Sequence, residues 1–209
     1  MQILVIAATA FEIEPFLAVN NQADVLITGV GVPSAMYHLQ KRIQQVDYDY
    51  IIQAGIAGSF NNETEFGKVV MVQRDCFADI GIEEKEIYTP LFKTGFADKD
   101  EFPFTDGWLV NPNEFSATND LPKVKAITVN RISDSALQKQ QYIRSFNAGI
   151  ESMEGAALHY VCLQEKIPFL QIRSISNLVG ERDKTKWKIK EAIENLNHEL
   201  ATLITQLTD

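Results

Sequence analysis

The clearest signals of the fold lie in ESMEGAALHYVCLQEKIPFLQIRSISNLVGERD, residues 151–183. Its first half is interpreted as a strand end that runs into a helix, because small and apolar side chains follow at steps of three and four until Pro168. The run FLQIRSI that follows, residues 169–175, has the composition and the length of a buried strand. In an open α/β sheet, ligands bind beyond the carboxyl ends of the strands. Three polar residues therefore lie where a ligand is expected, namely Arg173, Ser176 and Asn177.

The same alternation of strands and helices extends along the rest of the chain. Apolar runs predict further strands at residues 1–8, 23–28, 50–54, 67–72 and 124–129. Amphipathic patterns predict helices at residues 33–46, 134–144 and 183–207. Such alternation predicts an α/β fold with a parallel or mixed sheet covered on both faces. No linker, repeat or change in composition divides the chain, so we predict a single domain over residues 1–209.

The composition limits the classes of partner. The chain has 209 residues, 45% of them hydrophobic and 22% charged, as in ordinary globular proteins. A net charge of −9 leaves no surplus of lysine and arginine to bind the phosphates of a nucleic acid, so no nucleic-acid partner is expected. The first apolar run, MQILVIAATAF, lacks a basic region and is too short to cross a membrane. We therefore expect a cytoplasmic protein without a membrane partner.

Neither cysteine nor histidine forms a recognisable site. Cys76 and Cys162 are far apart and form no CxxC pair, which favours two buried thiols over a disulfide or a metal pair. His38, His159 and His198 lie in predicted helices without the spacing of metal ligands. We interpret them as surface or packing residues and expect neither a metal nor an organic cofactor.

Residues 79–120 interrupt the regular pattern. Aromatic residues are scattered here among glycine, proline and acidic residues: Tyr88, Phe92, Phe96, Phe102, Phe104, Trp108 and Phe115. An irregular segment of this length in a compact domain usually covers a site or an interface. The alternative is that these side chains pack against the edge of the sheet, and the sequence leaves both possibilities open.

Two motifs in the opening stretch resemble those of a known family. The segment SMEGAA, followed by RSISN at residues 173–177, resembles the Met-Glu-Gly/Ala-Ala-Ala segment and the Arg-x-x-Ser-Asp/Asn strand end of the nucleoside phosphorylase and nucleosidase family. The tail ISNLVGERD, with Trp187 after it, is most similar to the futalosine hydrolase group of that family. The resemblance implies a three-layer αβα fold with a central mixed, twisted sheet. It also implies cleavage of the N-glycosidic bond of a purine nucleoside.

Glu12 is the residue on which the expected type of reaction depends. Thr9 can cap a helix that carries Glu12, and a carboxylate in a first helical turn is often purely structural. In the hydrolases of the family, a glutamate in the matching place activates the attacking water, whereas the phosphorylases have an arginine in that region that binds phosphate. Residues 7–12 contain no arginine, and a carboxylate would repel phosphate. Resemblance and charge together favour hydrolysis.

The segment GIAG, residues 55–58, resembles the family's Gly-x-Ala-Gly turn, whose backbone borders the base and the sugar. Glycine permits a close approach of the backbone, so Gly55 and Ile56 are expected to bind substrate. The motif alone is weak, because any turn after a strand can use it. Many adenine-specific nucleosidases have serine at the position of Ile56, and its absence removes a hydroxyl near the expected water.

Met153 and Glu154 match the sugar-binding pair of the family. One carboxylate can accept hydrogen bonds from both ribose hydroxyls, and Met153 would pack against the sugar. The structural alternative for Glu154 is a solvated residue at the start of a helix. Arg173 would orient Glu12 or its water, or else form an ion pair at the strand end. Ser176 is expected beside the substrate.

The resemblance therefore implies a division of roles in the reaction. Glu12 would hold water, Glu154 with Met153 would hold the sugar, and Asn177 would stabilise the departing base. The expected substrate is futalosine, which would yield hypoxanthine in menaquinone biosynthesis. The alternatives are a methylthioadenosine or S-adenosylhomocysteine nucleosidase, which normally has aspartate at the position of Asn177, a phosphorylase, and a non-catalytic nucleoside-binding or storage protein. Because family members are commonly homo-oligomers, a homo-oligomer is also expected.

Overall fold

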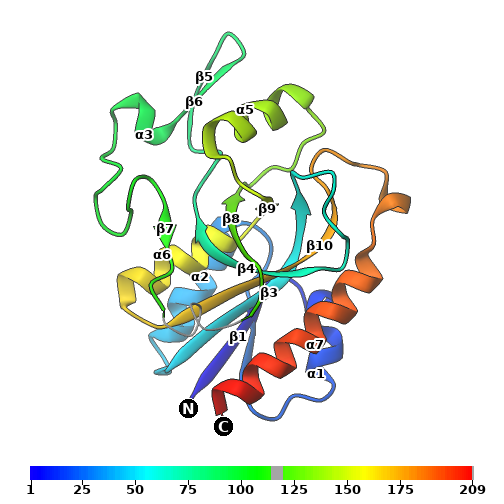
Figure 1. Ribbon diagram of the computed structural model, residues 1–209. Coiled ribbons are helices and arrows are strands. Elements are labelled where there is room, and N and C mark those ends of the chain that lie inside the picture. Colours follow the sequence, from blue (N-terminus) through cyan, green and yellow to red (C-terminus); the bar gives the residue numbers. More distant parts are fainter. Residues whose placement is uncertain (114–119, 209) are drawn as a thin grey trace.

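The computed structural model describes residues 1–113 and 120–208 (Figure 1). The strands in these residues are β1 Ile3–Ala7, β2 Asp24–Ile27, β3 Tyr50–Ser59, β4 Val69–Asp75, β5 Gly81–Glu84, β6 Ile87–Pro90, β7 Leu109–Val110, β8 Lys123–Thr128, β9 Ile150–Ser152 and β10 Phe169–Leu178. The α-helices are α1 Glu14–Leu17, α2 Val32–Ile43, α3 Leu91–Thr94, α5 Ala136–Phe146, α6 Gly155–Glu165 and α7 Ile189–Thr208. The 3₁₀ turns η1 Ala10–Ile13 and η2 Lys184–Lys186 precede α1 and α7.

A mixed sheet lies between two helical layers. In the described residues it has eight strands, and β2, β1, β3 and β10 follow one another in parallel. Figure 1 shows α1 and α7 on one face of these strands and α2 and α6 on the other. The predicted α/β class with a central mixed sheet between helices is therefore confirmed.

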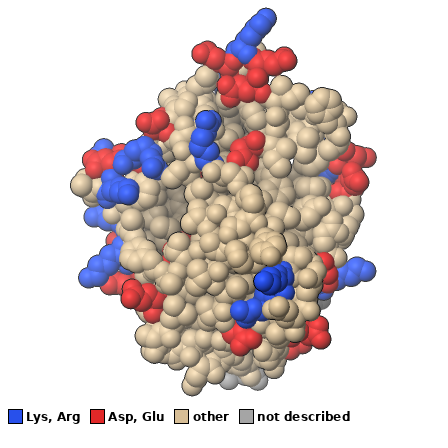
Figure 2. All heavy atoms as spheres, turned by 180° about the vertical axis from the view of Figure 1, so that it is seen from behind, with Lys and Arg blue, Asp and Glu red and all other residues tan. Residues whose placement is uncertain are grey.

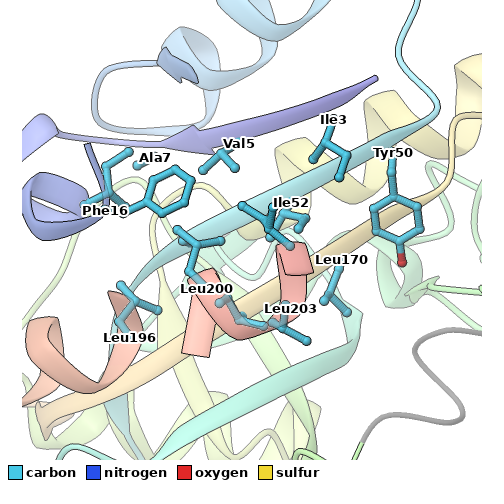
Figure 3. Packing of buried hydrophobic residues seen from close by; sticks show 14 of the residues in the cluster. Ile3, Val5, Ala7, Phe16, Tyr50, Ile52, Leu170, Leu196, Leu200 and Leu203 are labelled. Carbon is cyan, nitrogen blue, oxygen red and sulfur yellow. The ribbon is translucent and has the colours of Figure 1, made fainter. Parts of the chain in front are cut away.

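The core explains why the first strand reads as a continuous apolar run. Ile3 and Val5 face the layer of α7, where they pack in one cluster with Leu200 (Figure 3). Leu4 and Ile6 point to the opposite face, in a cluster with residues of α6. Because successive residues of a strand face opposite sides, a strand covered on both faces must be apolar throughout.

Part of the sheet closes on itself. β10 pairs with β4, β4 with β8, β8 with β9, and β9 returns to the end of β3. Small and branched side chains pack together in this ring: Ala57, Val70, Val72, Ala126, Ile150 and Ile175. The sequence did not predict the closure, because it depends on β9, which has three residues and therefore no periodic pattern of its own. The closure brings the end of β9 beside the ends of β3 and β10.

Several predicted boundaries were wrong, and three of them lie next to the site. We expected β3 to end at Ala54, with residues 55–58 forming a turn, but the strand continues to Ser59. We expected β10 to end at residue 175, but it continues to Leu178 through a β-bulge. The two strands pair with each other over this length, so each supplies the hydrogen bonds that extend the other. The last helix begins at Ile189 instead of residue 183, because the Asp183 carboxylate caps η2 by accepting from the Thr185 N–H at 3.0 Å.

The irregular segment predicted at residues 79–120 contains short elements. β5 and β6 form a hairpin that projects from the body of the protein at the top of Figure 1, followed by α3 and β7. Its aromatic side chains contact one another and helix α5: Phe92 makes an edge-to-face contact with Phe104, Tyr88 contacts Tyr142 of α5, and Trp108 contacts Phe146 of α5. Phe115 lies outside the described residues.

The cysteines and histidines have packing environments. Cys76 and Cys162 are buried free thiols, as predicted. His159 is fully buried, and its Nδ1 donates to the Leu109 carbonyl at 3.0 Å. Within residues 1–113 and 120–208, no group of three or more His, Cys, Asp or Glu side chains could hold a metal ion. The helices of the same residues include none that is both long and apolar enough to cross a membrane.

Candidate active site

A cavity of about 280 Å³ opens where the carboxyl ends of the parallel strands meet. Ala8 follows β1, Ile56 belongs to β3, and Asn177 belongs to β10. The start of α6 and the loop between β10 and α7 complete the wall. Ligands of α/β sheets bind at this edge.

Glu12 is a buried carboxylate held by three donors. Its Oε2 accepts from the backbone N–H of Thr9 at 3.1 Å and from the Thr9 hydroxyl at 3.0 Å. Its Oε1 accepts from the backbone N–H of Ile56 at 3.1 Å. The Asn197 side chain donates to the Glu12 carbonyl at 2.9 Å and anchors the turn to α7. The structural and functional interpretations of Glu12 therefore coincide, because the residue that caps η1 also lines the cavity.

Gly55 separates Glu12 from Arg173. A Cβ at Gly55 would lie 2.1 Å from Arg173 Nη1 and 3.0 Å from Glu12 Oε1. The guanidinium and the carboxylate thus lie on either side of Gly55, and a residue with a Cβ would not leave room for both. Arg173 is only 1% exposed and donates to Gln53 Oε1 at 2.8 Å. It lies behind the cavity wall, since neither Arg173 nor Gly55 lines the cavity itself.

Glu154 and Met153 lie at the start of α6 and line the cavity. The Glu154 carboxylate accepts from the backbone N–H of Gly31 at 2.9 Å and is 5% exposed. Burial raises the pKa of Glu154, while the Arg173 charge and the Gly31 N–H oppose this rise. Gly31 has φ +88°, a conformation that favours glycine and that directs its N–H toward the carboxylate. The Gly29-Val30-Gly31 turn thereby positions Glu154.

A bulge brings two successive residues of β10 to the cavity. Ile175 pairs with Ala57 and Asn177 pairs with Gly58, so Ser176 is the extra residue. Both Ser176 and Asn177 line the cavity, whereas regular strand residues would alternate between faces. The Ser176 hydroxyl donates to Asn177 Oδ1 at 2.7 Å, and Asn177 Nδ2 donates to the Leu178 carbonyl at 2.9 Å. The second N–H of the amide remains available to a ligand.

The structure thus brings most of the predicted site residues together. The predicted residues that line the cavity are Glu12, Ile56, Met153, Glu154, Ser176 and Asn177. Gly55 and Arg173 support the wall from behind. None of the aromatic residues of the described part of 79–120 lines this cavity.

Sequence reasoning missed several lining residues. Val30 and Ile132 follow strands far from the motifs, so their place depends on the tertiary fold. Arg182 also lines the cavity, with its guanidinium 5.6 Å from the ring centre of Trp187. The fourth missed residue is Glu151, a second carboxyl group next to the Met153–Glu154 pair. Its proximity to that motif was the only signal in the sequence.

Glu151 differs from the other three carboxylates that line the cavity, Glu12, Glu154 and Glu181, each of which accepts a hydrogen bond. It is 9% exposed, and no hydrogen bond or ion pair within the described residues engages its side chain. Burial raises its pKa to about 7; the Asp79 charge adds to the rise and the Lys139 charge opposes it. The cavity therefore contains one carboxyl group without a partner.

These groups suit chemistry on a neutral, polar small molecule. The cavity wall offers an oriented carboxylate at Glu12, a buried hydrogen-bond acceptor at Glu154 beside Met153, and an amide donor at Asn177. Such an arrangement can hold a nucleophilic water, hydroxyl groups and a leaving group that gains negative charge.

Known proteins share the sequence pattern and the fold. The family model described as the phosphorylase superfamily matches residues 3–208. The chain is 27% identical to the futalosine hydrolase of Thermus thermophilus, over 87% of this chain and 80% of that protein. It is 26% identical to the 5'-methylthioadenosine/S-adenosylhomocysteine nucleosidase of Colwellia psychrerythraea, over 76% and 69% of the two chains. The native structure of futalosine hydrolase of Helicobacter pylori superposes with a TM-score of 0.81 at 16% identity and covers 99% of this chain and 98% of that one. The family match spans nearly the whole chain, and the protein belongs to the phosphorylase superfamily.

Proposed function

We propose that this protein hydrolyses the N-glycosidic bond of a purine nucleoside, and that futalosine is the substrate. The observation that carries the proposal is the oriented carboxylate of Glu12, which shares one cavity with Glu154 and Asn177. The futalosine hydrolases among the similar proteins support the choice of substrate.

The proposed reaction is attack of water on the sugar carbon that carries the base. The carbon–nitrogen bond breaks, its electron pair leaves with the base, and the ribose gains positive charge in the transition state. Glu12 accepts a proton from the attacking water, and the Asn177 amide donates to the base as negative charge develops on it. Glu154 accepts hydrogen bonds from the ribose hydroxyls, and Met153 packs against the ring. The new carbon–oxygen bond gives a free ribosyl product. The departing base anion takes up a proton from solvent to give the free purine, and Glu12 returns its proton to solvent.

Arg173 acts in this proposal as a positioning residue. Its guanidinium faces Glu12 across Gly55 without a direct ion pair among the described residues, and its charge also reaches Glu154. This fixed positive charge lowers the pKa of Glu154 and so opposes the rise that burial causes. Ionised carboxylates are the forms that accept protons and hydrogen bonds.

Hydrolysis is favoured over phosphorolysis by the charge of the cavity wall. Glu12 occupies the place where a phosphate nucleophile would have to approach, and its charge opposes an anion. Among the described residues, Arg182 is the arginine that lines the cavity, and it lies in the loop after β10, beside Trp187. We infer that Arg182 and Trp187 contact the part of the substrate that extends beyond the sugar.

We further propose that hypoxanthine is the base released and that the reaction serves menaquinone biosynthesis. Two free thiols are typical of a reducing compartment, which supports a cytoplasmic location. A homo-oligomer is supported by apolar side chains at the cavity, since Phe11 and Val30 are 60% and 57% exposed. Figure 2 shows a broad face with few charged side chains, which a second copy could cover.

The experiment is chromatography of the free bases released from a panel of futalosine, inosine, methylthioadenosine and S-adenosylhomocysteine. We expect hypoxanthine release from futalosine to have the highest kcat/KM. Preferential release of adenine from methylthioadenosine would assign the protein to the alternative nucleosidase activity. Binding of a nucleoside without release of any base would instead support a non-catalytic binding or storage protein.

A further inference from the structure

Glu151, Gly58 and Asn177 form one row across three neighbouring strands. Gly58 of β3 is the register partner of Glu151 in β9 and also of Asn177 in β10. Neighbouring strands lie about 4.8 Å apart, so the backbones of Glu151 and Asn177 flank Gly58 at a separation of about 10 Å. Both side chains line the same cavity.

The middle residue of this row, Gly58, itself lines the cavity. A Cβ at Gly58 would lie 3.1 Å from Val179 Cγ2 and 3.4 Å from Asn177 Nδ2, so glycine allows these two side chains to pack closely against the strand. A flat ring in the cavity can lie between the polar side chains of Glu151 and Asn177. A purine has the corresponding shape, with polar atoms along its edges.

The two side chains differ in what they can bind. The Asn177 amide has a free N–H donor after its bond to the Leu178 carbonyl. The Glu151 carboxylate is an acceptor that the fold leaves without a partner, although it is nine-tenths buried. The Glu151 side chain lines the cavity, so a ligand with an N–H donor can supply the contact that the protein does not.

We propose that Glu151 recognises the base by accepting the N1–H of a 6-oxopurine, while Asn177 donates to the O6 and N7 edge of the same ring. The inference rests on the proposed function, to which it adds a second specificity residue. Hypoxanthine carries a proton on N1 and acceptors at O6 and N7, so it satisfies both side chains. Adenine has no proton on N1, which leaves a carboxylate facing an acceptor, and it has a donor at the position of O6.

The electrostatic surroundings of Glu151 are consistent with this role. Burial and the Asp79 charge raise its pKa to about 7, whereas Lys139 stabilises the ionised form. The Lys139 ammonium is held near the cavity by donating to the Val179 carbonyl at 3.0 Å. An N–H donor from a ligand would further stabilise the carboxylate.

The test combines binding and turnover. Titration calorimetry of the wild-type protein with hypoxanthine, 1-methylhypoxanthine and adenine measures the role of the N1 proton without a variant or a reaction. We expect hypoxanthine to bind at least about 10-fold more tightly than either of the other two bases, as for a charge-assisted hydrogen bond. Equal affinity for hypoxanthine and its 1-methyl derivative would overturn the inference.

The second part of the test measures turnover by the variant Glu151→Gln. A glutamine can present either a carbonyl acceptor or an amide donor, so it should relax the choice of base. We expect kcat/KM for futalosine to fall by about 10–100-fold, and the ratio of futalosine to methylthioadenosine cleavage to fall with it. Glu165→Gln, at the exposed end of α6 and away from the cavity, is the matched control and should leave that ratio unchanged.

The outcomes separate this inference from the proposed function. Suppose that the wild type cleaves futalosine and that Glu151→Gln lowers kcat/KM for futalosine and methylthioadenosine by the same factor. The proposed role of Glu151 is then overturned, whereas the proposed hydrolase activity is supported. If the wild type cleaves no nucleoside, the proposed function fails, and the effect of N1 methylation on hypoxanthine binding still decides the role of Glu151.

Discussion

The Glu12 carboxylate accepts a hydrogen bond from the backbone N–H of Ile56 at 3.1 Å. Isoleucine at position 56 was expected to leave the site without a hydroxyl near the water, but the contact to Glu12 uses the backbone of Ile56 and does not depend on its side chain. The backbone of β3, and not a side-chain hydroxyl, orients the carboxylate at this point. The Thr9 N–H and hydroxyl hold its other oxygen, so the orientation of Glu12 depends on the path of the chain.

Glu12→Gln is therefore expected to lower kcat by a factor of about 10²–10⁴ with a small change in KM, because the amide cannot accept a proton from water. Steady-state kinetics on the best substrate of the panel measures both constants. Glu14→Gln, an exposed carboxylate of the same segment, is the control and should resemble the wild type. Near-normal kcat for Glu12→Gln would assign water activation to another group.

Gly55→Ala should destabilise the protein by about 1–3 kcal/mol and reduce kcat, since the new Cβ would displace Arg173 or Glu12. Arg173 is fully enclosed and has little room to move. Gly149→Ala is the matched control, because a Cβ there would have its nearest neighbour at 3.7 Å, an ordinary van der Waals contact. Urea unfolding measures the free energy of unfolding of both variants. Equal values would show that the wall behind the cavity is not tightly packed.

These residues also show which parts of the site could be predicted from the sequence. Glu12 and Asn177 lie within short motifs at strand ends, so local pattern and family resemblance were sufficient to find them. Glu151 and Val30 reach the cavity through the closure of the sheet and through a turn that packs against α6, and these are tertiary features. The bulge in β10 is likewise set by pairing with β3, which a single strand sequence does not reveal.

Asn177→Asp is expected to shift the preference toward adenine nucleosides. Adenine leaves poorly unless it is protonated, and an aspartic acid can deliver the proton that asparagine cannot. The kcat/KM for futalosine should fall and that for methylthioadenosine should rise. A wild-type enzyme that already prefers methylthioadenosine would contradict this role of Asn177.

Glu151→Gln should change how stability depends on pH. The native pKa of Glu151 is raised from 4.5 to about 7, so between these values the native state binds more protons than the unfolded state. The contribution of Glu151 to the free energy of unfolding therefore decreases as the pH rises from about 4.5 to about 7. A glutamine does not titrate and adds no such dependence on pH. The stability of the variant relative to the wild type should increase across this window, as measured by urea unfolding at several pH values. A constant difference would mean that Glu151 titrates normally.

In the proposed reaction, water and not phosphate attacks the sugar carbon that carries the base, and Glu12 accepts the proton of that water. The direct measurement is the rate of base release in phosphate-free buffer and in added phosphate, with identification of the sugar product. We expect equal rates and a free ribosyl product in both buffers. A strict requirement for phosphate, with a ribosyl 1-phosphate product, would contradict it.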